Sequence, residues 1–213
     1  MQFEAPSGYP LGTNKTFKYA AAILIPILKI LTKREWRGAE NLPKSGPVIV
    51  ISNHLSYVDA LVFAHFLYGN GRAVRYLGKD SVFKIPILGK IIASSGQIPV
   101  ARESDKASHA LDSALGLLKA GHCVGVYPEG TLTRDENLWP MVAKTGLARL
   151  AIATHTPIIP IAQWGSQIVM PTYGKKIKFF PRTPINVLAG KPLDLSPWYG
   201  KESDPVALRE ATA

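Results

Sequence analysis

Residues 48–59 read Val-Ile-Val-Ile-Ser-Asn-His-Leu-Ser-Tyr-Val-Asp. The first five residues form a short, mostly β-branched run, which is typical of a strand buried on both faces. Polar residues follow, and residues 60–68 then have the pattern of a helix that ends at Gly69-Asn70-Gly71. A buried strand, a polar turn and a helix in this order predict the first unit of an α/β fold.

The same alternation continues along the chain. Three further strands are predicted at 73–77, 123–127 and 158–162, and two further helices at 108–119 and 145–153. Strands that alternate with helices require crossover connections, which place the strands parallel and the helices on both faces of the sheet. We therefore expect a single α/β domain over 38–213, with a mixed, largely parallel sheet flanked by helices.

Composition supports one folded domain and narrows the kinds of partner. The 213 residues are 46% hydrophobic and 19% charged, which argues against intrinsic disorder. The single cysteine, Cys123, excludes an internal disulfide framework and a multi-cysteine metal site. The net charge of +10 favours an anionic partner, and a nucleic acid, a phospholipid surface or a phosphorylated small molecule would each satisfy it.

The segment 1–37 is distinct because its residues 17–31 are mostly apolar and are flanked by lysines and arginines. Its longest uninterrupted apolar stretch covers only residues 19–28, whereas a membrane-spanning helix needs about 20 residues. Pro26 is also expected to kink a helix there. We therefore predict an amphipathic helical segment that lies in a membrane interface, with Trp36 near the water boundary. A buried core helix with solvated lysines is the alternative.

Polar residues follow two of the predicted strands, and ligands of open α/β sheets gather at the carboxyl ends of strands. After the first of these strands, His54 and Asp59 are five residues apart. If a helix begins near Ser56, the carboxylate can fix the imidazole tautomer, leave Nε2 free to accept a proton and stabilise the imidazolium. The pair therefore predicts a general base. A helix-capping or otherwise satisfied histidine is the alternative.

The second strand of this kind ends at Tyr127 and leads into Glu129-Gly130-Thr131 and Arg134. Gly130 allows close approach of the backbone to a ligand, and amide groups there can donate to an anion. Arg134 and Arg102 carry guanidinium groups, which bind phosphate through two hydrogen bonds, although each alone would be interpreted as a solvated surface charge. Together with the histidine, these residues predict a phosphorylated substrate beside a general base.

Four motifs occur in order along the chain: Asn53-His54-x4-Asp59, Pro99-Val100-Ala101-Arg102, Tyr127 to Arg134, and Thr156 to Ile161. With these motifs, most of the chain resembles the glycerolipid acyltransferases, in particular the 1-acyl-glycerol-3-phosphate acyltransferases. Three positions depart from the family pattern, since Pro99 replaces a usual aromatic residue, Ala101 a common aspartate, and Leu132 the arginine after Glu-Gly-Thr. These departures affect the expected acceptor head group more than the expected chemistry.

The resemblance implies an acyl transfer with no acyl-enzyme intermediate. His54 would deprotonate the sn-2 hydroxyl of 1-acyl-glycerol-3-phosphate, Asp59 would orient His54, and the hydroxyl would attack a fatty acyl thioester. The thioester would be acyl-CoA or an acyl group carried on acyl carrier protein (acyl-ACP), and the product would be phosphatidic acid, an intermediate of phospholipid biosynthesis. The implied ligands of the glycerol phosphate are Arg102, Glu129, Gly130, Thr131 and Arg134. The residues of a possible acyl groove are Lys79, Pro86, Gly89 and Pro160.

The same resemblance implies a place and partners for the protein. We expect peripheral or monotopic association with the cytoplasmic face of the cell membrane, lysophosphatidic acid as acceptor, no metal or other cofactor, and no nucleic acid. Another lysophospholipid or a glycolipid as acceptor is an open alternative.

An alternative from a different class is a non-catalytic basic module. Residues 173–182 interleave lysines and an arginine with Tyr173, Phe179 and Phe180, as a membrane- or nucleic-acid-binding surface would. A lipid-facing patch explains this stretch equally well. A serine or cysteine nucleophile finds no support, because Ser56 lies in no Gly-x-Ser-x-Gly turn and Cys123 lies in a predicted apolar strand.

Overall fold

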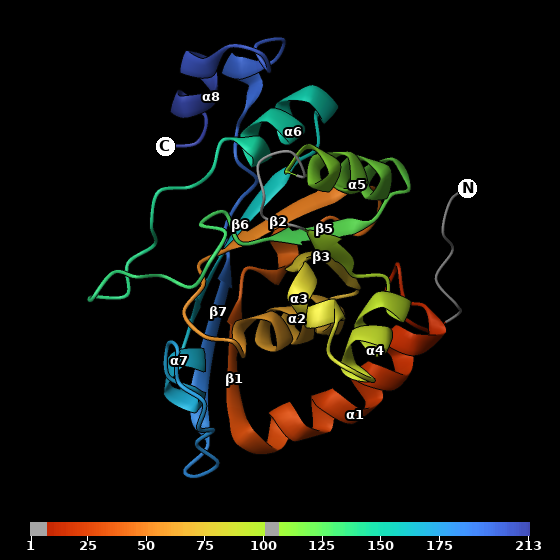
Figure 1. Ribbon diagram of the computed structural model, residues 1–213, viewed down its shortest axis with the longest axis vertical. Helices are drawn as coiled ribbons and strands as arrows, with labels where there is room; N and C mark the ends of the chain where they lie inside the picture. The colour runs from red at the N-terminus through yellow and green to blue at the C-terminus, as the bar shows by residue number, and fades with distance from the viewer. Residues whose placement is uncertain (1–7, 101–106) are drawn as a thin grey trace.

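The computed structural model describes residues 8–100 and 107–213 of the chain. Within these residues a seven-stranded sheet has the order β1-β7-β6-β2-β5-β3-β4 (Figure 1). The strands are β1 (Thr32–Arg37), β2 (Val48–Ser52), β3 (Val74–Lys79), β4 (Ile98–Val100), β5 (Cys123–Val126), β6 (Ile158–Trp164) and β7 (Thr183–Ala189). Neighbouring strands are parallel except for β6 and β7, which are antiparallel. The predicted class, an α/β domain with a mixed, largely parallel sheet, is confirmed.

Helices cover both faces of the sheet. They are α1 (Lys15–Leu31), α2 (Asp59–Gly69), α3 (Asp80–Phe83), α4 (Leu88–Ser94), α5 (Ala107–Lys119), α6 (Gly146–Thr154), α7 (Ser166–Val169) and α8 (Pro205–Glu210), with short 3-10 helices η1 (Ala39–Asn41) and η3 (Ser196–Trp198). The helix α2 packs on one face, and α5 and α6 pack on the other (Figure 1). Side chains of β2 alternate between the two layers: Val48 and Val50 pack with Phe63 of α2, whereas Ile49 packs with Leu118 of α5. The predicted central strand is therefore buried on both faces.

The N-terminal helix α1 has two apolar sides. Its inner side packs against α2, where the rings of Phe17 and Tyr68 are stacked with centroids 5.4 Å apart. Its outer side exposes a row of apolar side chains at helical spacing: Tyr19, Ile23, Ile27 and Ile30. The helix continues through Pro26 as one element from Lys15 to Leu31. Of the helices in the described residues, none has the length and apolarity that a membrane crossing requires.

Residues 32–37, which the sequence interpretation assigned to the N-terminal segment, form the edge strand β1. This strand pairs in parallel with β7, beginning with Thr32 opposite Thr183. Trp36, which was expected near the water boundary of a membrane, is half-buried, and its ring packs edge-on against His65 and Phe66 of α2. The strand was missed because it is mostly charged and because its partner strand lies far away in the sequence.

Candidate active site

The predicted histidine–aspartate pair is formed. His54 lies in the turn after β2, and Asp59 is the first residue of α2, so the turn brings the carboxylate back to the imidazole. Nδ1 of His54 lies 2.9 Å from Oδ2 of Asp59. The Asp59 side chain is fully buried, whereas 19% of the His54 side chain is exposed. The imidazole is therefore held from the protein side and reaches solvent with the rest of its ring.

Asp59 accepts hydrogen bonds at both of its oxygens. Besides His54, Oδ2 accepts from the backbone N–H groups of Leu55 and Ser56 at 2.5 and 2.8 Å. Oδ1 accepts from the hydroxyl of Ser166, the first residue of α7. A carboxylate surrounded by donors acts as an acceptor only, so Nδ1 of His54 carries the proton and Nε2 keeps its lone pair.

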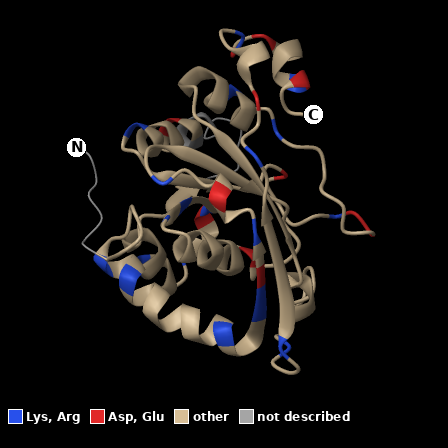
Figure 2. Cartoon of the chain, turned by 180° about the vertical axis from the view of Figure 1, so that it is seen from behind, with Lys and Arg blue, Asp and Glu red and all other residues tan. Residues whose placement is uncertain are grey.

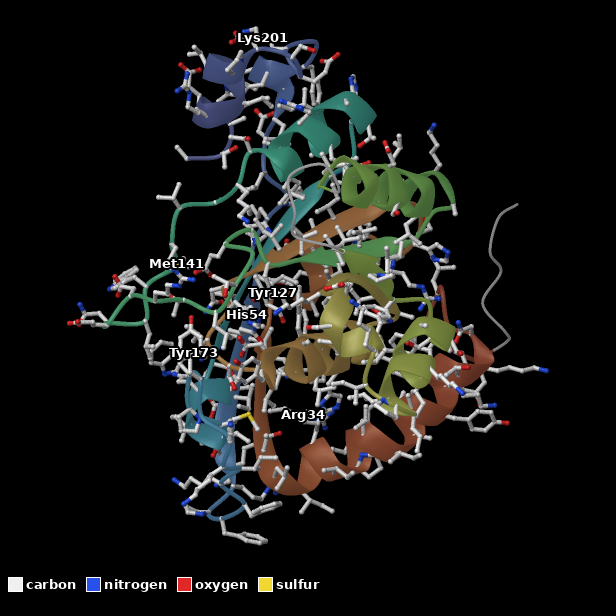
Figure 3. All side chains as sticks on the ribbon, viewed as in Figure 1. Arg34, His54, Tyr127, Met141, Tyr173 and Lys201 are labelled. Atoms are coloured by element: carbon white, nitrogen blue, oxygen red, sulfur yellow. The ribbon has the colours of Figure 1, made fainter. Side chains whose placement is uncertain are left out.

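The plane of the imidazole is set by Tyr127, which follows β5. The two rings are stacked with centroids 3.9 Å apart and 16° between their planes, and they lie together in Figure 3. Tyr127 in turn contacts Phe63 of α2. Stacking and the hydrogen bond to Asp59 together restrict the imidazole to one orientation.

Glu129 joins the two segments that the sequence analysis singled out. Its buried carboxylate accepts from the backbone N–H of His54 at 3.1 Å through Oε1 and from that of Met141 at 3.0 Å through Oε2. The N–H of Thr133 donates to the carbonyl of His54 at 2.8 Å. The resemblance implied a ligand of the glycerol phosphate at Glu129, but each of its oxygens already holds a backbone group in place.

Asn53 extends the pairing of β2 and β6 beyond the ends of the strands. Its Nδ2 donates to the carbonyl of Gln163 and its Oδ1 accepts from the N–H of Gln163, both at 2.9 Å. The Nε2 of Gln163 donates to the carbonyl of Asn53 at 3.1 Å. The turn that carries the histidine is therefore fixed by β6 on one side and by Glu129 on the other.

The turn after β5 lies against a cation, Lys144, that the sequence interpretation did not include. Gly130 has a φ of +73°, and its N–H donates to the carbonyl of Tyr127, so this amide is already engaged. A Cβ atom on Gly130 would come within 2.9 Å of the Lys144 Nζ, so the missing side chain makes room for this lysine. Leu132, which replaces the arginine of the family pattern, is buried. Lys144 was missed because it belongs to a separate loop.

The remaining predicted ligands are Thr131, Arg134 and Arg102. Arg134 is exposed and Thr131 is half-buried, both in the turn after β5. Arg102 lies outside the described residues. The structure therefore places Glu129 against the turn that carries His54, places Gly130 beside Lys144, and leaves Arg134 at the surface.

A cavity of about 800 Å³ lies next to Glu129 and Asn53. The sheet contributes its apolar wall through Pro160, Ala162, Trp164 and Leu188, and the loop 137–141 lies opposite. Ile159 and Ile161, which alternate with these β6 residues, pack on the α2 side. The cavity therefore lies on the sheet face away from α2.

The four residues of the predicted acyl groove do not share this cavity. Pro160 lines it, whereas Lys79 ends β3 and Pro86 precedes α4. Gly89 has a structural role, because a Cβ there would come within 1.9 Å of the carbonyl oxygen of Phe83. The cavity and the α3–α4 region lie on opposite sides of β2 and β5 in the sheet.

Ser166 is the positioning group that the sequence could not reveal. It lies 107 residues from Asp59 along the chain and meets it only because α7 follows β6, the neighbour of β2. No three His, Cys, Asp or Glu side chains of the described residues are grouped to hold a metal ion. The arrangement suits a proton acceptor with a fixed orientation, the His54 imidazole.

An oriented histidine at the carboxyl end of the central strand of an α/β domain is the arrangement of enzymes that use a general base. More specifically, the chain belongs to the acyltransferase family, whose model matches residues 33–164. The resemblance drawn from the motifs is confirmed by this match.

Several proteins with similar sequences are named 1-acyl-sn-glycerol-3-phosphate acyltransferases. The chain is 30% identical over 174 residues to the chloroplastic 1-acyl-sn-glycerol-3-phosphate acyltransferase BAT2 of Brassica napus, covering 81% of this chain and 47% of that protein. It is 25% identical over 177 residues to the 1-acyl-sn-glycerol-3-phosphate acyltransferase of Bacillus subtilis, covering 83% and 82%. The chain thus spans about half the length of the plant relative. The crystal structure of PlsC from Thermotoga maritima is similar with a TM-score of 0.64 and 22% identity over 92% of this chain and 78% of that one, which shows the same fold.

Proposed function

We propose that the protein transfers a fatty acyl group from acyl-CoA or acyl carrier protein to the sn-2 hydroxyl of 1-acyl-glycerol-3-phosphate and so forms phosphatidic acid. The observation that carries the proposal is the 2.9 Å contact between Nδ1 of His54 and the buried Asp59. Relatives named for this activity support the choice of acceptor. Another lysophospholipid or a glycolipid is the alternative acceptor.

The geometry supports a direct transfer. Nε2 of His54 takes the proton of the acceptor hydroxyl while the oxygen attacks the thioester carbonyl. The carbon–sulfur bond then breaks, and the leaving thiolate takes the proton from the imidazolium. Asp59 stabilises the transient positive charge on the ring, and the fixed ring plane contributes by positioning.

The phosphate of the acceptor requires cations near the base. Lys144 beside Gly130 and the exposed Arg134 are the described side chains that suit this role. Because Leu132 replaces the family arginine, we propose that Lys144 takes over part of that charge. No cofactor is needed, since the thioester is already activated.

Lipid-product analysis with one acyl thioester and a panel of acceptors tests this function. We expect product with 1-acyl-glycerol-3-phosphate and a loss of turnover of about 10²–10⁴-fold in His54→Ala. His155→Asn is a matched control, because His155 caps α6 in a left-handed conformation that asparagine tolerates. Activity on a non-phosphorylated acceptor alone, or an unchanged rate in His54→Ala, would contradict the proposal.

We also propose that α1 holds the protein at the cytoplasmic face of the cell membrane as a peripheral or monotopic protein. The exposed row of Tyr19, Ile23, Ile27 and Ile30, with lysines at both ends of the helix, supports this. Deleting the segment would also remove the buried inner side of α1, so substitutions on the outer side are the cleaner test. Ile23→Ser with Ile27→Ser should weaken sedimentation with liposomes, and unchanged sedimentation would contradict the proposal.

A further inference from the structure

The loop that connects α7 to β7, residues 170–182, carries side chains that the proposed catalysis does not use. Its residues from Lys175 to Arg182 are all exposed. Phe179 and Phe180 are 57% and 73% exposed, next to the basic residues of the loop. Adjacent exposed phenylalanines are unfavourable in water, and aromatic side chains beside cations suit the boundary between a bilayer and water.

The tip of loop 170–182 emerges at the same end of the sheet as the C-terminus of α1. The helix ends at Leu31, and Thr32 of β1 pairs with Thr183, the first residue of β7. Both connections therefore leave the sheet side by side, at the lower end of the molecule in Figure 1. Figure 2 shows lysines and arginines on α1 and at the tip of this loop.

Arg182 joins the loop to the helix. Its Nη2 donates to the carbonyl of Lys29 at 2.6 Å and to that of Thr32 at 2.7 Å. These carbonyls belong to the C-terminal end of α1, where a guanidinium both satisfies free acceptors and interacts favourably with the helix dipole. The loop is thus tied to the C-terminal end of α1, the helix that carries the exposed apolar row.

We infer that loop 170–182 is a second membrane contact, whose aromatic tip enters the interface of an anionic phospholipid bilayer beside α1 while Lys175, Lys176 and Lys178 bind the headgroups. The inference rests on the membrane association proposed above for α1. A nucleic acid would use the same cations, but it would leave the adjoining apolar row of α1 without a partner. Two contacts fix an orientation that a single helix leaves free to rotate.

The base of the loop is bound to the catalytic turn. Ser56 donates through its hydroxyl to the carbonyl of Met170 at 2.7 Å, and Thr172 donates to the carbonyl of Leu55 at 2.7 Å. The hydroxyl of Tyr173 donates to the carbonyl of Leu132 at 3.0 Å, and Figure 3 shows Tyr173 on the side of His54 toward the tip. A docked tip would therefore orient the active site relative to the bilayer.

A fluorescent label at the tip tests for insertion. Cys123, the single cysteine, is buried, and burial raises the pKa of its thiol to about 12, so a cysteine introduced at the surface reacts selectively. We expect an environment-sensitive dye on Phe179→Cys to shift to the blue on phosphatidylcholine vesicles that contain phosphatidylglycerol. The same dye on Val206→Cys, an exposed position on α8, should not shift. No shift at residue 179 under conditions where the protein binds vesicles would overturn the inference and leave the role of α1 standing.

Charge removal tests the headgroup contact. Lys175→Gln with Lys176→Gln should weaken binding to these vesicles about 30-fold. Lys119→Gln with Lys201→Gln changes the net charge equally, and Lys201 lies at the opposite end of the molecule (Figure 3). An equal effect of both pairs would overturn the inference, because it would reduce the contact to net charge.

Two further measurements separate the inference from the proposed function. If the Lys175/Lys176 pair affected binding to an RNA or DNA oligonucleotide and not to vesicles, the membrane role of the loop would be wrong. Absence of all vesicle binding would overturn the loop and the α1 proposals together. Acyl transfer to 1-acyl-glycerol-3-phosphate in detergent micelles reports on the catalytic proposal independently of both.

Discussion

Asp59 and Glu129 are buried carboxylates that follow the neighbouring strands β2 and β5, Asp59 as the first residue of α2 and Glu129 in the turn after β5. Within the described residues, neither is paired with a lysine or an arginine. Asp59 accepts from a histidine ring, two backbone groups and a serine hydroxyl, whereas the described donors to Glu129 are two backbone N–H groups. One carboxylate thus acts on a side chain that can react, and the other fixes the backbone that carries this side chain.

The difference shows how two similar motif residues have different roles. Both satisfy their oxygens, as burial requires. Of the two, only Asp59 has a described partner whose charge can change by proton transfer, so in the proposed mechanism the charge of Asp59 enters the energy of the reaction. Glu129 holds the His54 turn and the loop 135–144 together through two hydrogen bonds, so it affects the reaction only by positioning His54. Each substitution below tests one side of this comparison.

The largest effect is expected for Asp59→Asn. An amide has the wrong set of donors and acceptors for this position and lacks the charge that stabilises the imidazolium. We expect kcat to fall by about 10²–10⁴-fold. Circular dichroism provides the control for folding, because the side chain is buried. A folded variant with near-normal kcat would show that Asp59 is structural like Glu129.

Glu129→Gln is expected to have a smaller effect of a different kind. Glutamine has one acceptor oxygen and an NH2 group in place of the other, so the backbone N–H of either His54 or Met141 loses its acceptor. We expect kcat to fall by about 10-fold or more through misplacement of the histidine, with KM for the acceptor little changed. Glu210→Gln on α8 is the control. A rise in KM with unchanged kcat would assign Glu129 to substrate binding, as the family resemblance implied.

Ser166→Ala removes the donor to Oδ1 of Asp59 and leaves the contact with His54 intact. A hydrogen bond to a charged group contributes at least about 1.5 kcal/mol, which corresponds to a fall in kcat of about 10-fold. Ser166→Thr keeps the hydroxyl and should restore much of the rate. Equal losses in both variants would indicate a packing role for this position.

The sequence predicted the centre of the fold better than its edge. β2, β5 and β6 were predicted because strands buried on both faces are continuous apolar runs. β1 was missed because a charged edge strand has no such run, and β7 because exposed positions of this strand carry Pro184 and Leu188, so its sequence lacks the regular alternation of apolar and polar residues. The site followed the same rule: His54 and Asp59 are close in sequence, whereas Ser166 and Lys144 reach the site only through the tertiary fold.

Lys144→Gln tests the cation beside Gly130. If Lys144 replaces the family arginine, KM for 1-acyl-glycerol-3-phosphate should rise by about 5–10-fold, because one charge-assisted hydrogen bond to phosphate is lost. The turnover number should change little, since neither carboxylate is affected. Lys119→Gln at the end of α5 is the matched control. An unchanged KM would contradict this role of Lys144 and leave Arg134, among the described residues, as the candidate that binds the phosphate.

The smallest effect is expected for a substitution in the cavity that Glu129 helps to line. Ala162 lines it and is exposed there, so Ala162→Trp fills space without disturbing the core on the α2 side. If the cavity takes an acyl chain, long-chain donors or acceptors should lose about threefold or more in kcat/KM, as expected for the loss of a few buried methylene contacts, and short chains should be unaffected. Leu193→Trp, an exposed apolar position after β7 that does not line the cavity, serves as control. An equal loss for all chain lengths would instead point to displacement of Glu129, because the cavity wall and this carboxylate are neighbours.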